Sequence, residues 1–91
     1  MLPADMPTPT EVRDKVRGFI LESYMAGLDP ASLKDEVSLE RAHIVDSARV
    51  LDLIMFIEET FGFEVANDDA TPENFDTVDN IVAYVGRKQA P

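Results

Sequence analysis

The chain has 91 residues and a formal net charge of −10, with 8 lysines and arginines against 18 aspartates and glutamates. This length fits one domain, and so acidic a balance argues against nucleic acid or an anionic membrane surface as a partner, because both bind clustered basic residues. The chain has no cysteine, so it can form neither disulfides nor thiolate metal sites. It has one histidine, which leaves few residues for a histidine-based catalytic dyad or metal site.

Residues 1–7 contain two prolines and no hydrophobic periodicity, so we expect a flexible leader there. Thr8 and Glu11 have the spacing of a capping box at the start of a helix. Apolar residues then recur at helical spacing as far as a glycine at position 27, which favours a helix end. The pattern predicts a first helix over 9–25.

Residues 27–46 form the longest irregular stretch, with a short helical turn expected at 31–36. Apolar residues are spaced along this stretch, which indicates that it packs across the domain. A loop of this length within a compact domain is often functional.

The second helix is predicted over 47–61, capped by Asp46 and ended by Gly62. One side of this helix carries the hydrophobic residues expected in the core. The opposite side mixes acids with a large apolar side chain, and we expect it to be a contact surface. At about 100° per residue, this side consists of Ala48, Asp52, Met55 and Glu59.

A single capped turn is predicted at 71–75 and a last helix over 77–86, the latter capped by Asp76. Residues 63–65 alternate as a strand would, but they are too few and have no partner segment. The chain is therefore predicted to be all-α, an antiparallel bundle of three longer helices and one short helix with a long loop between the first two. The core is expected to draw on Val12, Val16, Phe19, Ile20, Val50, Leu53, Ile54, Ile57, Phe61, Val78, Ile81 and Val85.

No membrane segment or secretory signal is expected. The longest apolar run, 53–57, is far shorter than the about 20 residues that a membrane span needs. The N-terminus lacks a basic region followed by an apolar one. We therefore expect a cytoplasmic protein, and its acidity favours basic proteins as partners.

Ser47 is the candidate site of modification or anion binding. A serine at the start of a helix lies beside unpaired backbone N–H groups at the positive end of the helix dipole, where a phosphate is stabilised. Taken alone, Asp46 and Ser47 are explained more simply as helix-starting residues. His43 is expected to be a polar loop or packing residue, and 67–69 a solvated turn, because 67–69 lacks the alternating ligands and glycine of a calcium loop.

The segment 46–65 resembles the central part of the acyl carrier protein family. In that family an Asp-Ser-Leu motif opens a helix that continues with an acid, Leu, Val and Met. Leu, Glu and an acid follow, and then Phe, a turn and an acid with Ile. The matching residues here are Asp46, Ser47, Asp52, Leu53, Ile54, Met55, Ile57, Glu58, Glu59, Phe61, Glu64 and Val65. The resemblance extends over 10–87 and includes 76–78 at the start of the last helix.

The resemblance implies that Ser47 is the attachment point of a 4′-phosphopantetheine arm, delivered from coenzyme A by a separate phosphopantetheinyl transferase. The thiol of the arm would hold an acyl or aminoacyl cargo as a thioester, so the chain would be a carrier and not an enzyme. Other partners would be an acyl- or aminoacyl-activating ligase and downstream acyl-processing enzymes. The residues expected to recognise partners are Asp46, Ala48, Asp52, Met55, Glu58 and Glu59.

The charge around this motif suits partners with basic docking surfaces. Between residues 44 and 85, Arg49 is the only cation against ten acids. A field of one sign steers basic partners and weakens as salt rises. We expect a monomer with a leader at 1–7, a carrier domain at 8–87 and a C-terminal tail at 88–91.

Three positions depart from the family pattern. Ala48 replaces the usual Leu, Arg49 replaces an acid, and Ile44 stands where glycine is common. These changes favour a specialised stand-alone carrier over the housekeeping carrier of fatty-acid synthesis. The alternative is an unmodified acidic helical interaction module, which predicts that Ser47→Ala leaves function intact. An enzyme is unsupported, because the sequence offers no His-Ser-acid set, glycine-rich phosphate loop or metal cluster.

Overall fold

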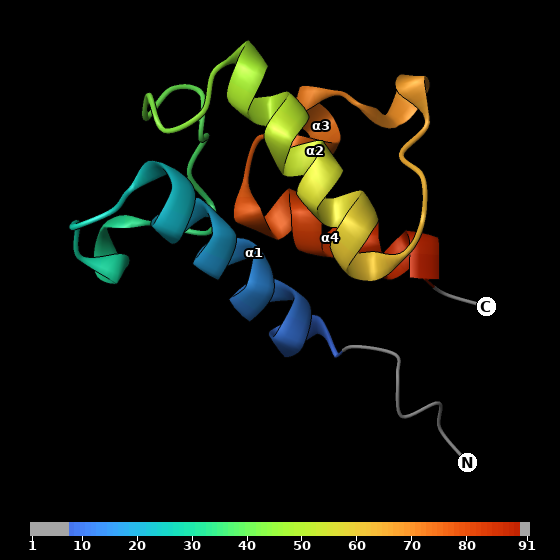
Figure 1. The fold of residues 1–91 in the computed structure, drawn as a ribbon, viewed down its shortest axis with the longest axis horizontal. Coiled ribbons are helices and arrows are strands. Elements are labelled where there is room, and N and C mark those ends of the chain that lie inside the picture. The colour runs from blue at the N-terminus through green and yellow to red at the C-terminus, as the bar shows by residue number, and fades with distance from the viewer. Residues whose placement is uncertain (1–7, 90–91) are drawn as a thin grey trace.

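The computed structural model describes residues 8–89, which form four α-helices and two 3-10 turns (Figure 1). No strand occurs within this range, and the prediction of an all-α bundle with a long first loop is confirmed. None of the helices described is long and apolar enough to cross a bilayer. The elements are α1 (Pro9–Tyr24), η1 (Pro30–Ser32), α2 (Ser47–Phe61), η2 (Asn67–Asp69), α3 (Pro72–Phe75) and α4 (Val78–Gln89).

The first helix begins as the sequence predicts. The Thr8 hydroxyl accepts a hydrogen bond from the Glu11 N–H at 3.1 Å, and the Glu11 carboxylate accepts one from the Thr8 N–H at 3.2 Å. These two bonds satisfy donors that the first turn of a helix otherwise leaves unpaired. In Figure 1, α1 and α2 run in opposite directions, with α4 behind α2.

The last helix differs from the prediction at both ends. Thr77 caps it, since its hydroxyl accepts from the Asn80 N–H at 3.0 Å. Asp76, the predicted cap, is engaged elsewhere: its N–H closes α3 and its carboxylate accepts from the Glu40 N–H at 3.3 Å. Asp76 and Thr77 both have side chains that can cap a helix. Because the Asp76 carboxylate binds the Glu40 N–H, Thr77 caps α4.

The C-terminal end of α4 runs past the predicted boundary at position 86. Arg87 and Lys88 lie in the last turn, where their positive charges interact favourably with the negative end of the helix dipole. The Gln89 side chain donates to the Phe61 carbonyl at 3.0 Å and so holds this turn against α2. Lys88 and Gln89, expected in a tail, are therefore helical, and the predicted leader at 1–7 lies outside the described residues.

Most of the predicted core is buried, but Phe19 and Val50 are only partly so. Both pack against the core from its edge. Seven further residues outside the expected core set are buried, and three of them belong to the long loop and are at most 4% exposed. The expectation that the loop packs across the domain is thereby confirmed. These seven residues are Met25, Leu33, Leu39, Val45, Phe75, Val82 and Tyr84.

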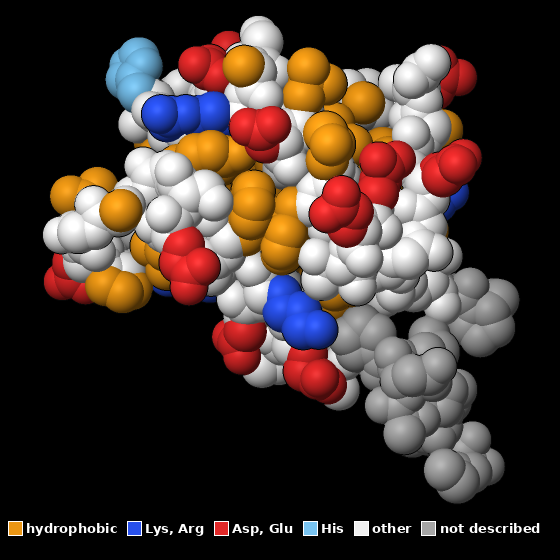
Figure 2. All heavy atoms as spheres, in the orientation of Figure 1, with side chains coloured by type: hydrophobic (Ala, Val, Ile, Leu, Met, Phe, Trp, Pro, Cys, Tyr) orange, Lys and Arg blue, Asp and Glu red, His pale blue; other side chains and the backbone are white. Residues whose placement is uncertain are grey.

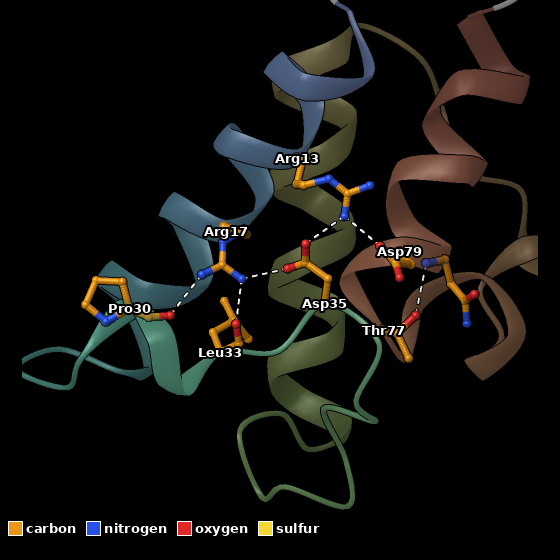
Figure 3. Close-up of polar contacts among 8 residues, drawn as sticks. Arg13, Arg17, Pro30, Leu33, Asp35, Thr77 and Asp79 are labelled. Carbon is orange, nitrogen blue, oxygen red and sulfur yellow. Dashed lines mark hydrogen bonds and ion pairs between the residues drawn. The ribbon is translucent and has the colours of Figure 1, made fainter.

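Two arginines of α1 hold the long loop in place, as Figure 3 shows. Arg13 donates to Asp35 at 2.7 Å and to Asp79 at 2.6 Å. Arg17 donates to the other oxygen of Asp35 and to the Leu33 carbonyl, both at 2.6 Å. The Asp79 N–H also donates to the Asp35 carbonyl at 3.0 Å. The loop is thus fastened to α1 and to the first turn of α4 before it reaches α2.

Candidate functional site

Ser47 is the first residue of α2, and its side chain is exposed. The Asp46 carboxylate caps the helix by accepting from the Arg49 N–H at 3.0 Å, and the Asp46 carbonyl accepts from the Val50 N–H at 2.9 Å. Within residues 8–89, the N–H groups of Ser47 and Ala48 have no hydrogen-bond partner. The Ser47 hydroxyl therefore lies at the positive end of the α2 dipole, beside two unpaired donors.

The segment that leads into Ser47 is anchored in the core. Val45 is 4% exposed, and its N–H and that of Ile44 both donate to the Leu39 carbonyl, at 3.2 and 3.0 Å. The Leu39 N–H donates to the Asp76 carbonyl at 2.7 Å. His43, just before this anchor, is exposed and has a φ of 60°, in the left-handed region. These contacts fix the place of α2's first residue relative to α3.

A groove of about 640 Å³ opens beside Ser47. The end of the long loop and the first turn of α2 form one side, and the segment around α3 forms the other. Its lining includes His43, Arg49, Val50, Thr71 and Phe75. This volume falls within the about 300–1,000 Å³ of small-molecule sites, and the lining mixes apolar and polar groups as such sites do.

These features fit a phosphate-linked group on Ser47. The hydroxyl is open to an external enzyme, the unpaired N–H groups suit an anion, and the groove gives an attached chain a surface to lie against. Within the described residues, no group of three or more His, Cys, Asp or Glu is arranged to hold a metal ion. In the turn at 67–69, Asp69 accepts a hydrogen bond from the Tyr84 hydroxyl at 2.9 Å.

Five of the six predicted recognition residues are exposed, and the sixth is half-buried. Met55 is 56% exposed, so it is a surface residue rather than a core residue. Glu58 is the half-buried one, and its carboxylate accepts from the Val65 N–H at 2.8 Å. None of these acids forms an ion pair within the part of the chain that the structure describes. The five exposed residues are Asp46, Ala48, Asp52, Met55 and Glu59.

One exposed apolar residue of this surface was not predicted from the sequence. Leu51 is 63% exposed, and its spacing of four residues from Met55 was a signal that could have identified it. A hollow of about 450 Å³ between α1 and α2 is lined in part by Phe19, Tyr24 and Phe56. In Figure 2, hydrophobic side chains lie at the centre of this face, with acidic side chains around them.

The chain is similar over most of its length to several curated proteins named acyl carrier protein. That of Thermotoga maritima is 35% identical over 83 residues, which cover 91% of this chain and 98% of that protein. That of Chlamydia trachomatis is 32% identical over 78 residues, covering 86% and 96%. That of Bdellovibrio bacteriovorus is 32% identical over 77 residues, covering 85% and 94%. No protein-family model matches the chain.

Proposed function

The chain belongs to the acyl carrier protein family, and we propose on that basis that it carries acyl or aminoacyl intermediates on a 4′-phosphopantetheine arm attached to Ser47. When bound, the arm supplies a thiol that holds the cargo as a thioester. The observation that supports this most strongly is the exposed Ser47 hydroxyl at the start of α2, beside two unpaired N–H groups.

A separate phosphopantetheinyl transferase performs the attachment. The Ser47 oxygen forms a bond to the phosphorus of coenzyme A that bears pantetheine, and the pyrophosphate bond breaks. Adenosine 3′,5′-bisphosphate leaves, and the hydroxyl proton passes to a base of the transferase. Within residues 8–89 no side chain is hydrogen-bonded to the Ser47 hydroxyl, so the base that activates it is assigned to the transferase.

The residues around Ser47 then hold the product. The N–H groups of Ser47 and Ala48 stabilise the negative charge of the phosphodiester, as helix N-termini do for phosphates in general. Asp46 keeps the first turn of α2 closed through its bond to the Arg49 N–H. The groove beside this turn offers the attached chain apolar contact along Val50 and Phe75.

Partner enzymes dock on the exposed face of α2. We assign this role to the transferase, to an acyl- or aminoacyl-activating ligase and to downstream acyl-processing enzymes. Asp52 and Glu59 have no ion pair within 8–89 and therefore remain available to basic side chains of a partner. The exposed side chains of Met55 and Leu51 supply apolar contact on the same helix. Glu58 acts indirectly, by holding Val65.

The departures from the family pattern favour a specialised pathway. Ala48 and Arg49 are both exposed next to Ser47, on the surface that partners contact. Growth of a strain that lacks its fatty-acid carrier tests this assignment. We expect this chain to fail to restore growth, and full rescue would contradict the specialised role.

The carrier function is tested by weighing the purified protein after incubation with coenzyme A, Mg²⁺ and a broad-specificity transferase. We expect a mass gain of one phosphopantetheinyl group that disappears in Ser47→Ala. Ser32→Ala is the matched control, since Ser32 is also exposed but lies in η1, and it should gain the full mass. No gain with several transferases would favour the unmodified interaction module.

A further inference from the structure

Arg49, in the first turn of α2, joins three segments around Ser47. Its guanidinium donates to the Ile44 carbonyl at 2.9 Å. The guanidinium carbon lies 5.0 Å from the centroid of the Tyr24 ring, at the end of α1. The Tyr24 hydroxyl donates to the Arg49 carbonyl at 3.0 Å. Arg49 therefore ties the end of α1 and the segment before Ser47 to the first turn of α2.

The chemistry of this contact favours an arginine over a lysine. A planar guanidinium can stack on an aromatic face and donate in its own plane at the same time, which the point charge of a lysine does less well. Tyr24 is itself held in place, because its ring meets Phe19 edge-on at 5.7 Å and Phe19 stacks on Phe56 at 4.2 Å. Arg49 thus rests on the Tyr24 ring, which belongs to an aromatic cluster packed between α1 and α2.

The segment that Arg49 holds is one that needs external support. His43 has a φ of 60°, a conformation that is unfavourable for a residue with a Cβ and persists where its surroundings impose it. The next residue, Ile44, is the one whose carbonyl Arg49 binds. Two residues further on, Asp46 accepts from the Arg49 N–H. Both the side chain and the backbone of Arg49 therefore constrain the approach to Ser47.

We propose that Arg49 is a positioning residue for the modification of Ser47. By linking the Ile44 carbonyl to the Tyr24 ring, it fixes the direction in which the Ser47 hydroxyl is presented to the transferase. Its guanidinium acts here through its contacts within the fold, with the Ile44 carbonyl and the Tyr24 ring. This inference rests on the proposed role of Ser47 as the attachment point.

The test compares Arg49→Met with Arg41→Met in transfer from coenzyme A. Arg41 is exposed, and its side chain forms no hydrogen bond or ion pair within the described residues, so both variants lose one charge near the site and only one loses the contacts. We expect Arg49→Met to lower kcat/KM about tenfold, as small misplacements of a reacting group do. The loss should persist in high salt, and Arg49→Lys should restore part of the rate.

The unmodified proteins supply an independent measurement. Backbone ¹⁵N relaxation should show greater motion at 44–47 in Arg49→Met but not in Arg41→Met. Unchanged relaxation, an unchanged transfer rate, or equal losses in both variants that disappear in high salt would each overturn the positioning role and leave the attachment at Ser47 intact. Failure of the parent protein to be modified would instead overturn the proposed function, and this inference with it.

Discussion

The carboxylate of Asp35 lies 2.6 Å from the guanidinium of Arg17, an ion pair that fastens the long loop to α1. The side chains are 23% and 22% exposed, so solvent screens the pair less than it would a surface pair. Burial by itself would raise the pKa of Asp35, but the hydrogen bonds from Arg17 and Arg13 outweigh it, and the pKa lies below its ordinary value of 3.8. The folded state therefore favours the ionised form of Asp35.

Asp35→Asn should destabilise the protein by about 1–2 kcal/mol at neutral pH, because hydrogen bonds to a charged group are lost. A carboxyl whose pKa is lowered on folding contributes stability above its unfolded pKa and loses that contribution as pH falls through the folded value. The difference in unfolding free energy between the parent and Asp35→Asn should therefore reach its full value above pH 3.8 and become smaller below it. Urea denaturation across this pH range measures it.

The control for this variant is Asp14→Asn. Asp14 is exposed and has no side-chain hydrogen bond or ion pair within 8–89. Its loss removes the same charge from a chain of net −10 and should leave stability unchanged or slightly raise it. Equal destabilisation by the two variants would refute the role of the Asp35 ion pairs.

Tyr84 should titrate far above an ordinary tyrosine. Burial and the hydrogen bond to Asp69 raise the pKa of Tyr84 from 10.0 to about 12. Because the folded state binds this proton more tightly, the associated stability is present below pH 10 and is lost as pH rises towards 12. Ultraviolet titration of Tyr24→Phe, which leaves Tyr84 as the only tyrosine, measures the pKa directly.

Asp69→Asn provides the control for this titration. It removes the second-largest cause of the shift, so the pKa of Tyr84 should fall but stay above 10.0 because burial remains. If Asp69→Asn leaves the pKa of Tyr84 unchanged, the Tyr84–Asp69 hydrogen bond does not form in solution.

Glu58 and Glu59 are neighbours that should behave differently. Glu58→Ala should lower stability by about 1 kcal/mol, because the Val65 N–H loses a charged acceptor. Glu59→Ala should leave stability unchanged and instead raise the KM of the transferase for this protein, most clearly at low salt. Denaturation curves measure the stability of both variants, and transfer kinetics measure the KM of the transferase for each. If the two variants change stability and KM equally, Glu58 and Glu59 do not have the separate roles assigned to them.

Added salt should raise the melting temperature. Ten acids and one cation lie between residues 44 and 85, and their mutual repulsion opposes the compact state until it is screened. Divalent cations should act at lower concentration than sodium chloride. A melting temperature that falls with moderate salt would show that the ion pairs of Arg13 and Arg17 outweigh this repulsion.

Local chemistry was enough to predict the helix starts and ends that depend on neighbours in sequence. The Thr8–Glu11 capping box and the stop at Gly62, whose φ is 75°, are examples. The prediction that Asp76 caps α4 was wrong, because its carboxylate accepts a hydrogen bond from the Glu40 N–H, 36 positions earlier. Such a contact depends on how the loop packs, which hydrophobic periodicity does not specify.

The features of the candidate site also fall into those that local sequence predicts and those that depend on packing. Ser47 at the start of a helix and the acidic face of α2 follow from spacing alone. The sequence shows Arg49 beside Ser47, but its engagement with Tyr24, 25 positions away, depends on the packing of α1 against α2. The groove likewise forms only where the loop end meets α3.

Attachment of the arm to Ser47 is tested by peptide-resolved mass spectrometry of the protein isolated from its own cells. We expect a phosphopantetheinyl group on the peptide that contains Ser47, with or without an acyl or aminoacyl cargo on its thiol. A Ser47 peptide that is never modified in protein from growing cells would contradict the attachment of the arm to Ser47.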